Sequence, residues 1–196
     1  RARENGVVLT YTNTVGGQDE LVFDGNSVIL DQTGEVIARG KAFDEDLIIA
    51  DLTVDAVTRN RMAQGRKKRF TVAMAEAVER VAVATVKAPV KRPRVVPQLE
   101  APLGELDEVY RALVVGVRDY VQKNGFKKVV IGLSGGVDSA LTAVIAVDAL
   151  GPKNVMGIFM PSPYTSSESG EDVADLTRRL KIDYRTIPIT PTFQSY

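Results

Sequence analysis

The sequence contains no cysteine and no histidine among its 196 residues. The first absence excludes disulfides, thiolate metal sites and a cysteine nucleophile from this chain, and it suits a reducing compartment. The second absence removes the commonest general base and the commonest zinc ligand. Any chemistry must therefore rest on carboxylates, lysines, hydroxyls, backbone amides and a bound hard cation.

An excess of charge is also absent, because 25 Lys and Arg residues balance 25 Asp and Glu residues. The field of the whole chain gives no reason to expect a polyanion or an anionic membrane surface as a partner. No apolar run reaches the length of a membrane span, and the N-terminal RARENGVVLT has no signal-peptide pattern. We therefore expect no nucleic-acid partner, no membrane association and a cytoplasmic protein.

The first 55 or so residues have the pattern of a β-sheet. Residues 6–15 (GVVLTYTNTV) are rich in β-branched residues, and residues 26–39 hold two strand-like runs around a turn that contains glycine. A further strand is expected at residues 46–54 (DLIIADLTV). Residues 1–55 are accordingly expected to be one domain.

Residues 56–103 are expected to form an interdomain linker. Prolines at positions 89, 93, 97 and 102 oppose regular helix and favour an extended connector. Residues 71–86 fit either a helix or a strand. The basic residues between positions 59 and 69 could contact RNA, but no aromatic side chains alternate with them to stack on bases, so we interpret the run as a solvated or interdomain surface.

The domain expected at residues 104–196 begins with an amphipathic helix. Apolar residues recur at three- and four-residue steps between Leu106 and Val121, and Gly125 stands where a left-handed C-cap is needed. After it, strand-like and helix-like runs alternate from residue 127 onward, which predicts right-handed βαβ units and a parallel sheet. Such sheets bind ligands beyond the carboxyl ends of their strands.

The loop SGGVDS, Ser134 to Ser139, stands at that position, between a strand and a helix. Gly135 and Gly136 permit unusual backbone angles and the close approach of a ligand. Successive N–H groups and the following helix N-terminus supply partial positive charge, and the two serines add hydroxyl donors. The loop is therefore expected to bind an anion such as phosphate.

Asp138 is an anion within this expected anion site, which makes sense if a cation such as Mg²⁺ bridges it to phosphates. The commoner phosphate loop, G-x-x-x-x-G-K-[ST], uses a lysine that this loop lacks, so the phosphates must be handled differently. The alternative is a tight turn in which Asp138 and Ser139 only cap the helix. The serine-rich YTSSES could contact the substrate, or it could only cap the helix that begins near Ser169, because Ser169 with Asp172 resembles a capping box.

The SGGVDS loop in this setting resembles the pyrophosphatase-loop family of ATP-dependent ligases, which includes synthetases for NAD, GMP, asparagine and argininosuccinate. Residues 157–189, with a Met-Pro-Ser turn and a serine-rich loop, resemble NAD synthetases. Residues 11–39, with GGQDELVFDG, resemble the end of the nitrilase-like domain that is fused to glutamine-dependent NAD synthetases. A polar turn with solvated Asp19, Glu20 and Asp24 is the alternative for that decapeptide.

The resemblance implies an α/β chain: the C-terminal portion of a nitrilase-like αββα sandwich, then a doubly wound parallel sheet of the adenine nucleotide alpha hydrolase-like kind. It implies ATP and Mg²⁺ as cofactors, deamido-NAD and glutamine or ammonia as further partners, and a homo-oligomer. Asp138 would be the metal ligand. The expected ATP-binding residues are Gly132, Leu133, Ser134, Gly135, Gly136, Val137, Asp138 and Ser139.

In that family a Glu-Lys-Cys triad hydrolyses glutamine, ammonia passes through a tunnel, and deamido-NAD is adenylated with release of AMP and pyrophosphate. The triad is expected upstream of Arg1, so no catalytic residue is expected in this chain. Two other functions stay open. One is another pyrophosphatase-loop amidotransferase such as GMP synthetase, and the other is a non-enzymatic module that binds adenine nucleotides.

Overall fold

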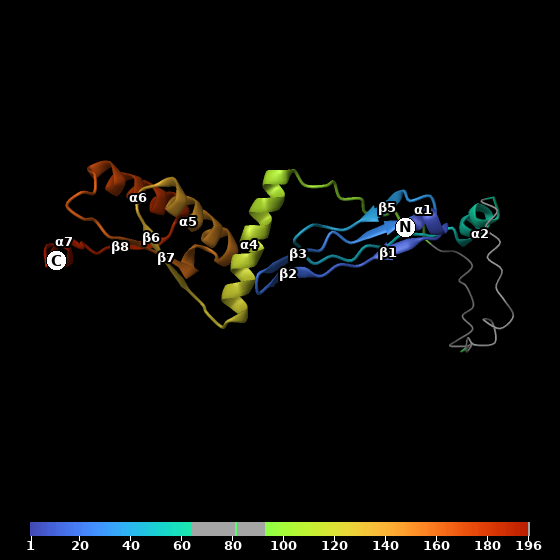
Figure 1. Cartoon of the computed structure of the whole chain (residues 1–196), viewed down its shortest axis with the longest axis horizontal. Coiled ribbons are helices and arrows are strands. Elements are labelled where there is room, and N and C mark those ends of the chain that lie inside the picture. Colours follow the sequence, from blue (N-terminus) through green and yellow to red (C-terminus); the bar gives the residue numbers. More distant parts are fainter. Residues whose placement is uncertain (64–80, 82–92, 196) are drawn as a thin grey trace. The chain divides into compact units, whose positions relative to one another are not determined.

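The computed structural model describes residues 1–63, 81 and 93–195, and the chain divides into two compact units (Figure 1). The first unit comprises the described residues of Arg1–Thr12, Asn26–Lys41 and Asp46–Ala101. The second comprises those of Asn13–Gly25, Ala42–Glu45 and Pro102–Tyr196. In the described part of the chain, no helix is both long and apolar enough to cross a membrane.

The first unit is built on a small antiparallel sheet in the order β1-β4-β5. These strands are Leu9–Tyr11, Val28–Leu30 and Val36–Arg39. The chain turns between β4 and β5 at Gly34, whose φ of +86° suits glycine. The Asp31 carboxylate accepts hydrogen bonds from the backbone N–H groups of Thr33 and Glu35 and so closes this turn. The strand pair predicted for residues 26–39 is confirmed.

The strand expected at residues 46–54 was wrong. No strand lies there: the segment runs without regular structure into α2, Val54–Ala63, while α1 is the short helix Ala2–Asn5. Asp46 instead uses its carboxylate to bind the backbone N–H groups of Lys41 and Leu47. The β-branched composition had suggested a strand, but a strand also requires a partner for its ladder. Apart from residue 81, the run 71–86 lies outside the described residues, as does most of the basic run.

The second unit contains a hairpin, a long helix and a parallel sheet. The hairpin pairs β2, Val15–Gln18, with β3, Leu21–Asp24, in antiparallel register. The helix α4, Glu105–Lys123, packs against both hairpin strands and against α5. It ends at Lys123, and Gly125, two residues later, has the left-handed φ of +76°, so the predicted amphipathic helix and its glycine stop are confirmed.

The parallel sheet has the order β6-β7-β8. Its strands are Val129–Leu133, Val155–Phe159 and Asp183–Thr186, and the helices that follow them are α5 (Val137–Leu150), α6 (Ser167–Leu180) and α7 (Thr190–Gln194). A single 3-10 turn, Pro152–Asn154, precedes β7. This alternation confirms the predicted βαβ arrangement. β8 pairs with β7 alone among the described strands, and all four of its residues are exposed.

The core of this sheet lies between β6, β7 and the helices α5 and α6. Leu133, Ala143 and Val173 are buried together, and Phe159 and Leu176 pack against them. Gly157 in β7 is needed for the close fit, because a Cβ there would lie 2.6 Å from Cδ1 of Leu133. The core therefore fixes the carboxyl end of β6, from which the SGGVDS loop leaves.

The domain limits expected from the sequence, residues 1–55, 56–103 and 104–196, remain a prediction. The two compact units do not coincide with these limits. The hairpin segment Asn13–Gly25 belongs to the second unit although it lies early in the chain.

Candidate functional site

The SGGVDS loop begins where β6 ends at Leu133, and α5 begins at Val137. Gly135 has a φ of +83°, a conformation that residues with a Cβ rarely adopt. A Cβ there would lie 2.8 Å from Cα and 2.9 Å from the carbonyl oxygen of Ser169 in α6. Glycine at this position is therefore required both by the turn and by the approach of the loop to α6.

Two serines stabilise the loop from inside. The Ser139 hydroxyl donates to the carbonyl of Gly136 at 2.9 Å and accepts from the backbone N–H of Ser134 at 3.2 Å. The Ser134 hydroxyl accepts from the N–H of Gly136 at 3.2 Å and lies 3.1 Å from the Ser139 hydroxyl. The loop is thus held in a defined shape by its own contacts, which reduces the cost of ordering it when a ligand binds.

The N-terminus of α5 is open to an anion. Gly136 is the N-cap, and no side chain caps the helix. The first N–H groups of a helix have no partner within the helix, so those of Val137, Asp138 and Ser139 point toward the loop with partial positive charge. Val137 is 78% exposed, so water or a ligand can reach this end. The arrangement fits a phosphate group.

Asp138 lies in the first turn of α5 with an exposed side chain, and it does not cap the helix. Its backbone carbonyl accepts the Thr142 hydroxyl at 2.8 Å. Within the described ranges, no group of three or more acidic residues could hold a metal ion by itself. A cation at Asp138 would therefore need further oxygen ligands from a bound phosphate or water, which is how Mg²⁺ is commonly held.

The segment after β7 lies next to the loop along the same edge of the sheet, since Gly132 pairs in register with Ile158 and Leu133 with Phe159. A Cβ on Gly132 would meet the Met160 methyl at 3.5 Å. The chain turns just after the Met-Pro-Ser sequence, at Pro163 and Tyr164, where the N–H of Thr165 donates to the Ser162 carbonyl at 3.1 Å.

The serine that caps α6 is Ser166, and the expected capping box at Ser169 and Asp172 was wrong. The Ser166 hydroxyl accepts from the N–H of Ser169 at 3.2 Å, and the two hydroxyls lie 3.0 Å apart. The cap lies three residues earlier than the apolar pattern suggested, because the first turn of the helix, SES, is polar.

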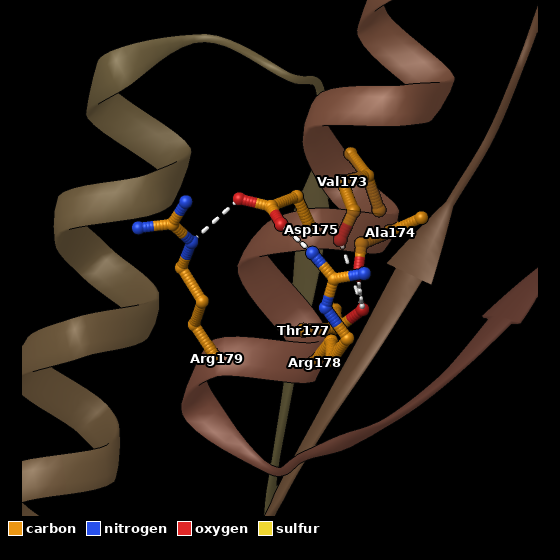
Figure 2. Close-up of polar contacts among 6 residues, drawn as sticks. All are labelled: Val173, Ala174, Asp175, Thr177, Arg178 and Arg179. Atoms are coloured by element: carbon orange, nitrogen blue, oxygen red, sulfur yellow. Dashed lines mark hydrogen bonds and ion pairs between the residues drawn. The ribbon is translucent and has the colours of Figure 1, made fainter.

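The positive side chains at the end of α6 are engaged on the helix itself (Figure 2). Asp175 binds the guanidinium of Arg178 and, at 2.5 Å, that of Arg179. The hydrogen bond from Arg179 is the largest cause of a pKa for Asp175 below its ordinary value, and the charges of both arginines add to it. These arginines therefore serve α6 locally, and we assign them no part in the anion site.

A contact that the sequence did not suggest joins α4 to the hairpin. The Asp119 carboxylate accepts the backbone N–H of Gly17 at 2.8 Å, and the Lys123 ammonium donates to the Gly17 carbonyl at 2.6 Å. Beside it lies a cavity of about 710 Å³, lined among others by Leu21, Val22 and Tyr120. No local signal marks this contact, because the residues are more than 100 positions apart.

A parallel sheet with this strand, glycine loop and helix defines a pyrophosphatase-loop domain. Comparison with known proteins agrees: residues 109–196 match the family model described as NAD synthase, and residues 1–62 match that of carbon-nitrogen hydrolases. The glutamine-dependent NAD(+) synthetases of Thermotoga maritima and Aquifex aeolicus are 48% and 41% identical to this chain over its whole length. Over its whole length the chain is similar to these glutamine-dependent NAD(+) synthetases.

The chain spans 34% of the length of each of these two curated relatives. A solved structure also matches, that of glutamine-dependent NAD+ synthetase from Acinetobacter baumannii in complex with adenosine diphosphate. It has a TM-score of 0.75 and 34% identity, over 99% of this chain and 30% of the other. The resemblance and the fold class inferred from the sequence, nitrilase-like and then pyrophosphatase-loop, are confirmed.

Proposed function

We propose that the chain contributes the ATP-binding loop to a C–N ligase that converts deamido-NAD to NAD, with ammonia taken from glutamine. The observation that carries this proposal is the preorganised anion site at Ser134–Ser139, with the uncapped N-terminus of α5 behind it. The similarity to NAD synthetases supports it, and so does the adenosine diphosphate in the complex of the Acinetobacter baumannii relative.

The phosphates of ATP would bind at Gly132, Leu133, Ser134, Gly135, Gly136, Val137, Asp138 and Ser139. The backbone N–H groups at the start of α5 and the hydroxyls of Ser134 and Ser139 would contact the β- and γ-phosphates. Asp138 would hold Mg²⁺, which would neutralise charge on the pyrophosphate. The adenine would lie near the end of β7, around Ile158 to Met160, where Met160 is 48% exposed.

The missing lysine predicts which bond breaks. A loop that binds the β- and γ-phosphates together stabilises departing pyrophosphate, whereas γ-phosphoryl transfer needs stabilisers around the terminal phosphorus. The nicotinate carboxylate would attack the α-phosphorus, and the α–β bond would break to give an acyl-adenylate and pyrophosphate. Ammonia would then attack the acyl carbon, and AMP would leave with one carboxylate oxygen and the amide would form.

Glutamine hydrolysis would require a thiol nucleophile outside this chain, which has no cysteine. Residues 1–62, which match the carbon-nitrogen hydrolase family model, would form part of the domain that hydrolyses glutamine. We further propose a cytoplasmic homo-oligomer, with residues 104–196 as the start of the synthetase domain.

The test uses the full-length protein that contains this chain, with ATP, ammonia and deamido-NAD labelled with ¹⁸O in its nicotinate carboxylate. We expect AMP that carries one ¹⁸O atom, with pyrophosphate and NAD as the other products. A parallel reaction of unlabelled substrate in ¹⁸O-water controls for exchange. ADP and phosphate as products would mean that the loop has been misassigned.

The same assay separates the two alternatives. Xanthosine monophosphate in place of deamido-NAD would be turned over by a GMP synthetase. Nucleotide binding without turnover of either substrate would indicate a non-enzymatic module. The intact SGGVDS with Asp138 favours the enzyme.

A further inference from the structure

The Gly17 peptide unit in the hairpin is held from both sides by one helix. Asp119 and Lys123 are four residues apart on α4, so their side chains lie on one face of that helix. One accepts the Gly17 N–H at 2.8 Å and the other donates to the Gly17 carbonyl at 2.6 Å. We call these two residues the Gly17 clamp.

The hairpin is shaped to fit the clamp. Gly16 has a φ of +130°, and a Cβ there would lie 2.7 Å from a carboxylate oxygen of Asp119. A Cβ on Gly17 would lie 3.2 Å from Cα of Gly116, so the backbones of hairpin and helix nearly touch. Both Gly16 and Gly17 are buried. Two consecutive glycines are therefore required by this contact.

Both residues of the clamp are charged, and Asp119 is largely shielded from water whereas Lys123 is exposed. The Asp119 side chain is 13% exposed and also accepts Arg118 Nε at 2.8 Å. Burial raises the pKa of Asp119, but the hydrogen bonds from Arg118 and Gly17 and the charges of Arg118 and Lys123 outweigh it, so the pKa lies below its usual value. Asp119 is accordingly an ionised acceptor, and hydrogen bonds to charged groups are the stronger ones.

The helix that carries the clamp also supports the anion site. α4 packs against α5, whose N-terminus forms that site, and the Tyr110 hydroxyl on α4 donates to Asp148 on α5 at 2.6 Å. The hairpin lies within the residues that match the carbon-nitrogen hydrolase family. The clamp therefore fixes a piece of hydrolase sequence onto the nucleotide-binding unit.

We propose that Asp119 and Lys123 are positioning residues for glutamine-dependent amidation: they hold the β2–β3 hairpin in place, and use of glutamine nitrogen depends on that placement. The inference rests on the proposed function. Because the clamp does not touch the SGGVDS loop, amidation with free ammonia does not depend on it. The two nitrogen sources thus report on different parts of the protein.

The experiment compares Asp119→Ala and Lys123→Met in the full-length protein, with Asp107→Ala and Lys127→Met as matched controls from the other end of α4 and from the segment after it. NAD formation is measured with glutamine and, separately, with ammonia. We expect each clamp variant to lose at least tenfold in the glutamine-dependent rate and to keep the ammonia-dependent rate within twofold. The controls should change neither rate.

Hydrogen–deuterium exchange of the Gly17 amide gives a readout that needs no activity. Exchange should accelerate in Asp119→Ala and stay slow in Asp107→Ala. Unchanged exchange, unchanged glutamine-dependent rates, or an equal loss of both rates would each overturn the proposal. Absence of ammonia-dependent NAD formation in the unsubstituted protein would overturn the proposed function instead. Exchange of the Gly17 amide would still test whether Asp119 binds it.

Discussion

Gly135 in the SGGVDS loop lies directly against Ser169 in the first turn of α6, with room for no more than a hydrogen atom between them. The loop is therefore supported by two helices: α5 continues from it, and α6 lies against its glycine. Its shape depends on a residue 34 positions further along the chain as well as on its own sequence.

Gly135→Ala should destabilise the protein more than Gly151→Ala does. Both glycines have similar φ angles, +83° and +80°, but nothing lies within 4 Å of a Cβ at Gly151. The control should cost about 1–3 kcal/mol for its backbone angles alone, because a φ of 80° with a ψ of 152° is adopted almost only by glycine. Gly135→Ala should cost roughly 1–3 kcal/mol more because of the clash. Urea unfolding measures both, and equal losses would show that the contact with Ser169 is unimportant.

Asp138→Asn should reduce NAD formation more than tenfold, which corresponds to at least about 1.4 kcal/mol of lost transition-state stabilisation. The change keeps the size of the side chain and removes the charge that would hold Mg²⁺. Steady-state kinetics in the full-length protein, with Asp172→Asn on exposed α6 as control, provides the measurement. Unchanged activity would show that the charge of Asp138 has no part in NAD formation.

Ser166→Ala should lower stability by about 1 kcal/mol, because it removes the hydroxyl that accepts the Ser169 N–H. Ser167→Ala changes the neighbouring exposed serine, which lies inside the helix, and it should have little effect. Thermal unfolding of the two variants would separate them. The assignment of the cap fails if Ser167→Ala is the more damaging change.

Tyr110→Phe should remove a phenol that ionises only at unusually high pH. The hydrogen bond to Asp148, then burial and the Asp148 charge, raise the pKa of Tyr110 from 10.0 to about 12. Since the folded pKa exceeds the unfolded one, the stabilisation is complete below pH 10 and is lost as the pH rises through about 12. Phenolate absorbance between about pH 9 and 12.5 should lose its latest component in Tyr110→Phe but keep it in Tyr120→Phe.

At about pH 8 the same variant should lose about 1 kcal/mol of stability, since solvent screens part of a hydrogen bond to a charged group. Urea unfolding at that pH checks the value. A variant as stable as the unsubstituted protein would show that the contact between Tyr110 and Asp148 contributes nothing.

The elements of the nucleotide-binding unit could be predicted because their signals are local. The apolar run of β6, the glycines of the loop and the periodic residues of α4 all act within a few positions of one another. Local patterns failed where a distant partner decides. Residues 46–54 have strand propensity but pair with no strand among the described residues. The cap at Ser166 was missed because the first turn of α6 is polar.

Some features of the SGGVDS loop were also predictable from the sequence, and others were not. The turn, the serines and the open helix N-terminus follow from the hexapeptide itself. The approach of Ser169 to Gly135 does not, and neither do the contacts of Asp119 and Lys123 with Gly17, because tertiary packing alone brings these residues together. No periodicity in a single sequence encodes such a pairing.

Among the described strands β8 has one open side, where its backbone groups could accept an incoming strand from another molecule. Asp183 and Arg185 alternate along this strand with Tyr184 and Thr186, so one face carries a negative and then a positive charge. A foreign strand stacking its own side chains beside them would have to match both signs in the correct register. The two charges thus select the register in which a strand can pair with β8, a property separate from any ligand chemistry in the SGGVDS loop.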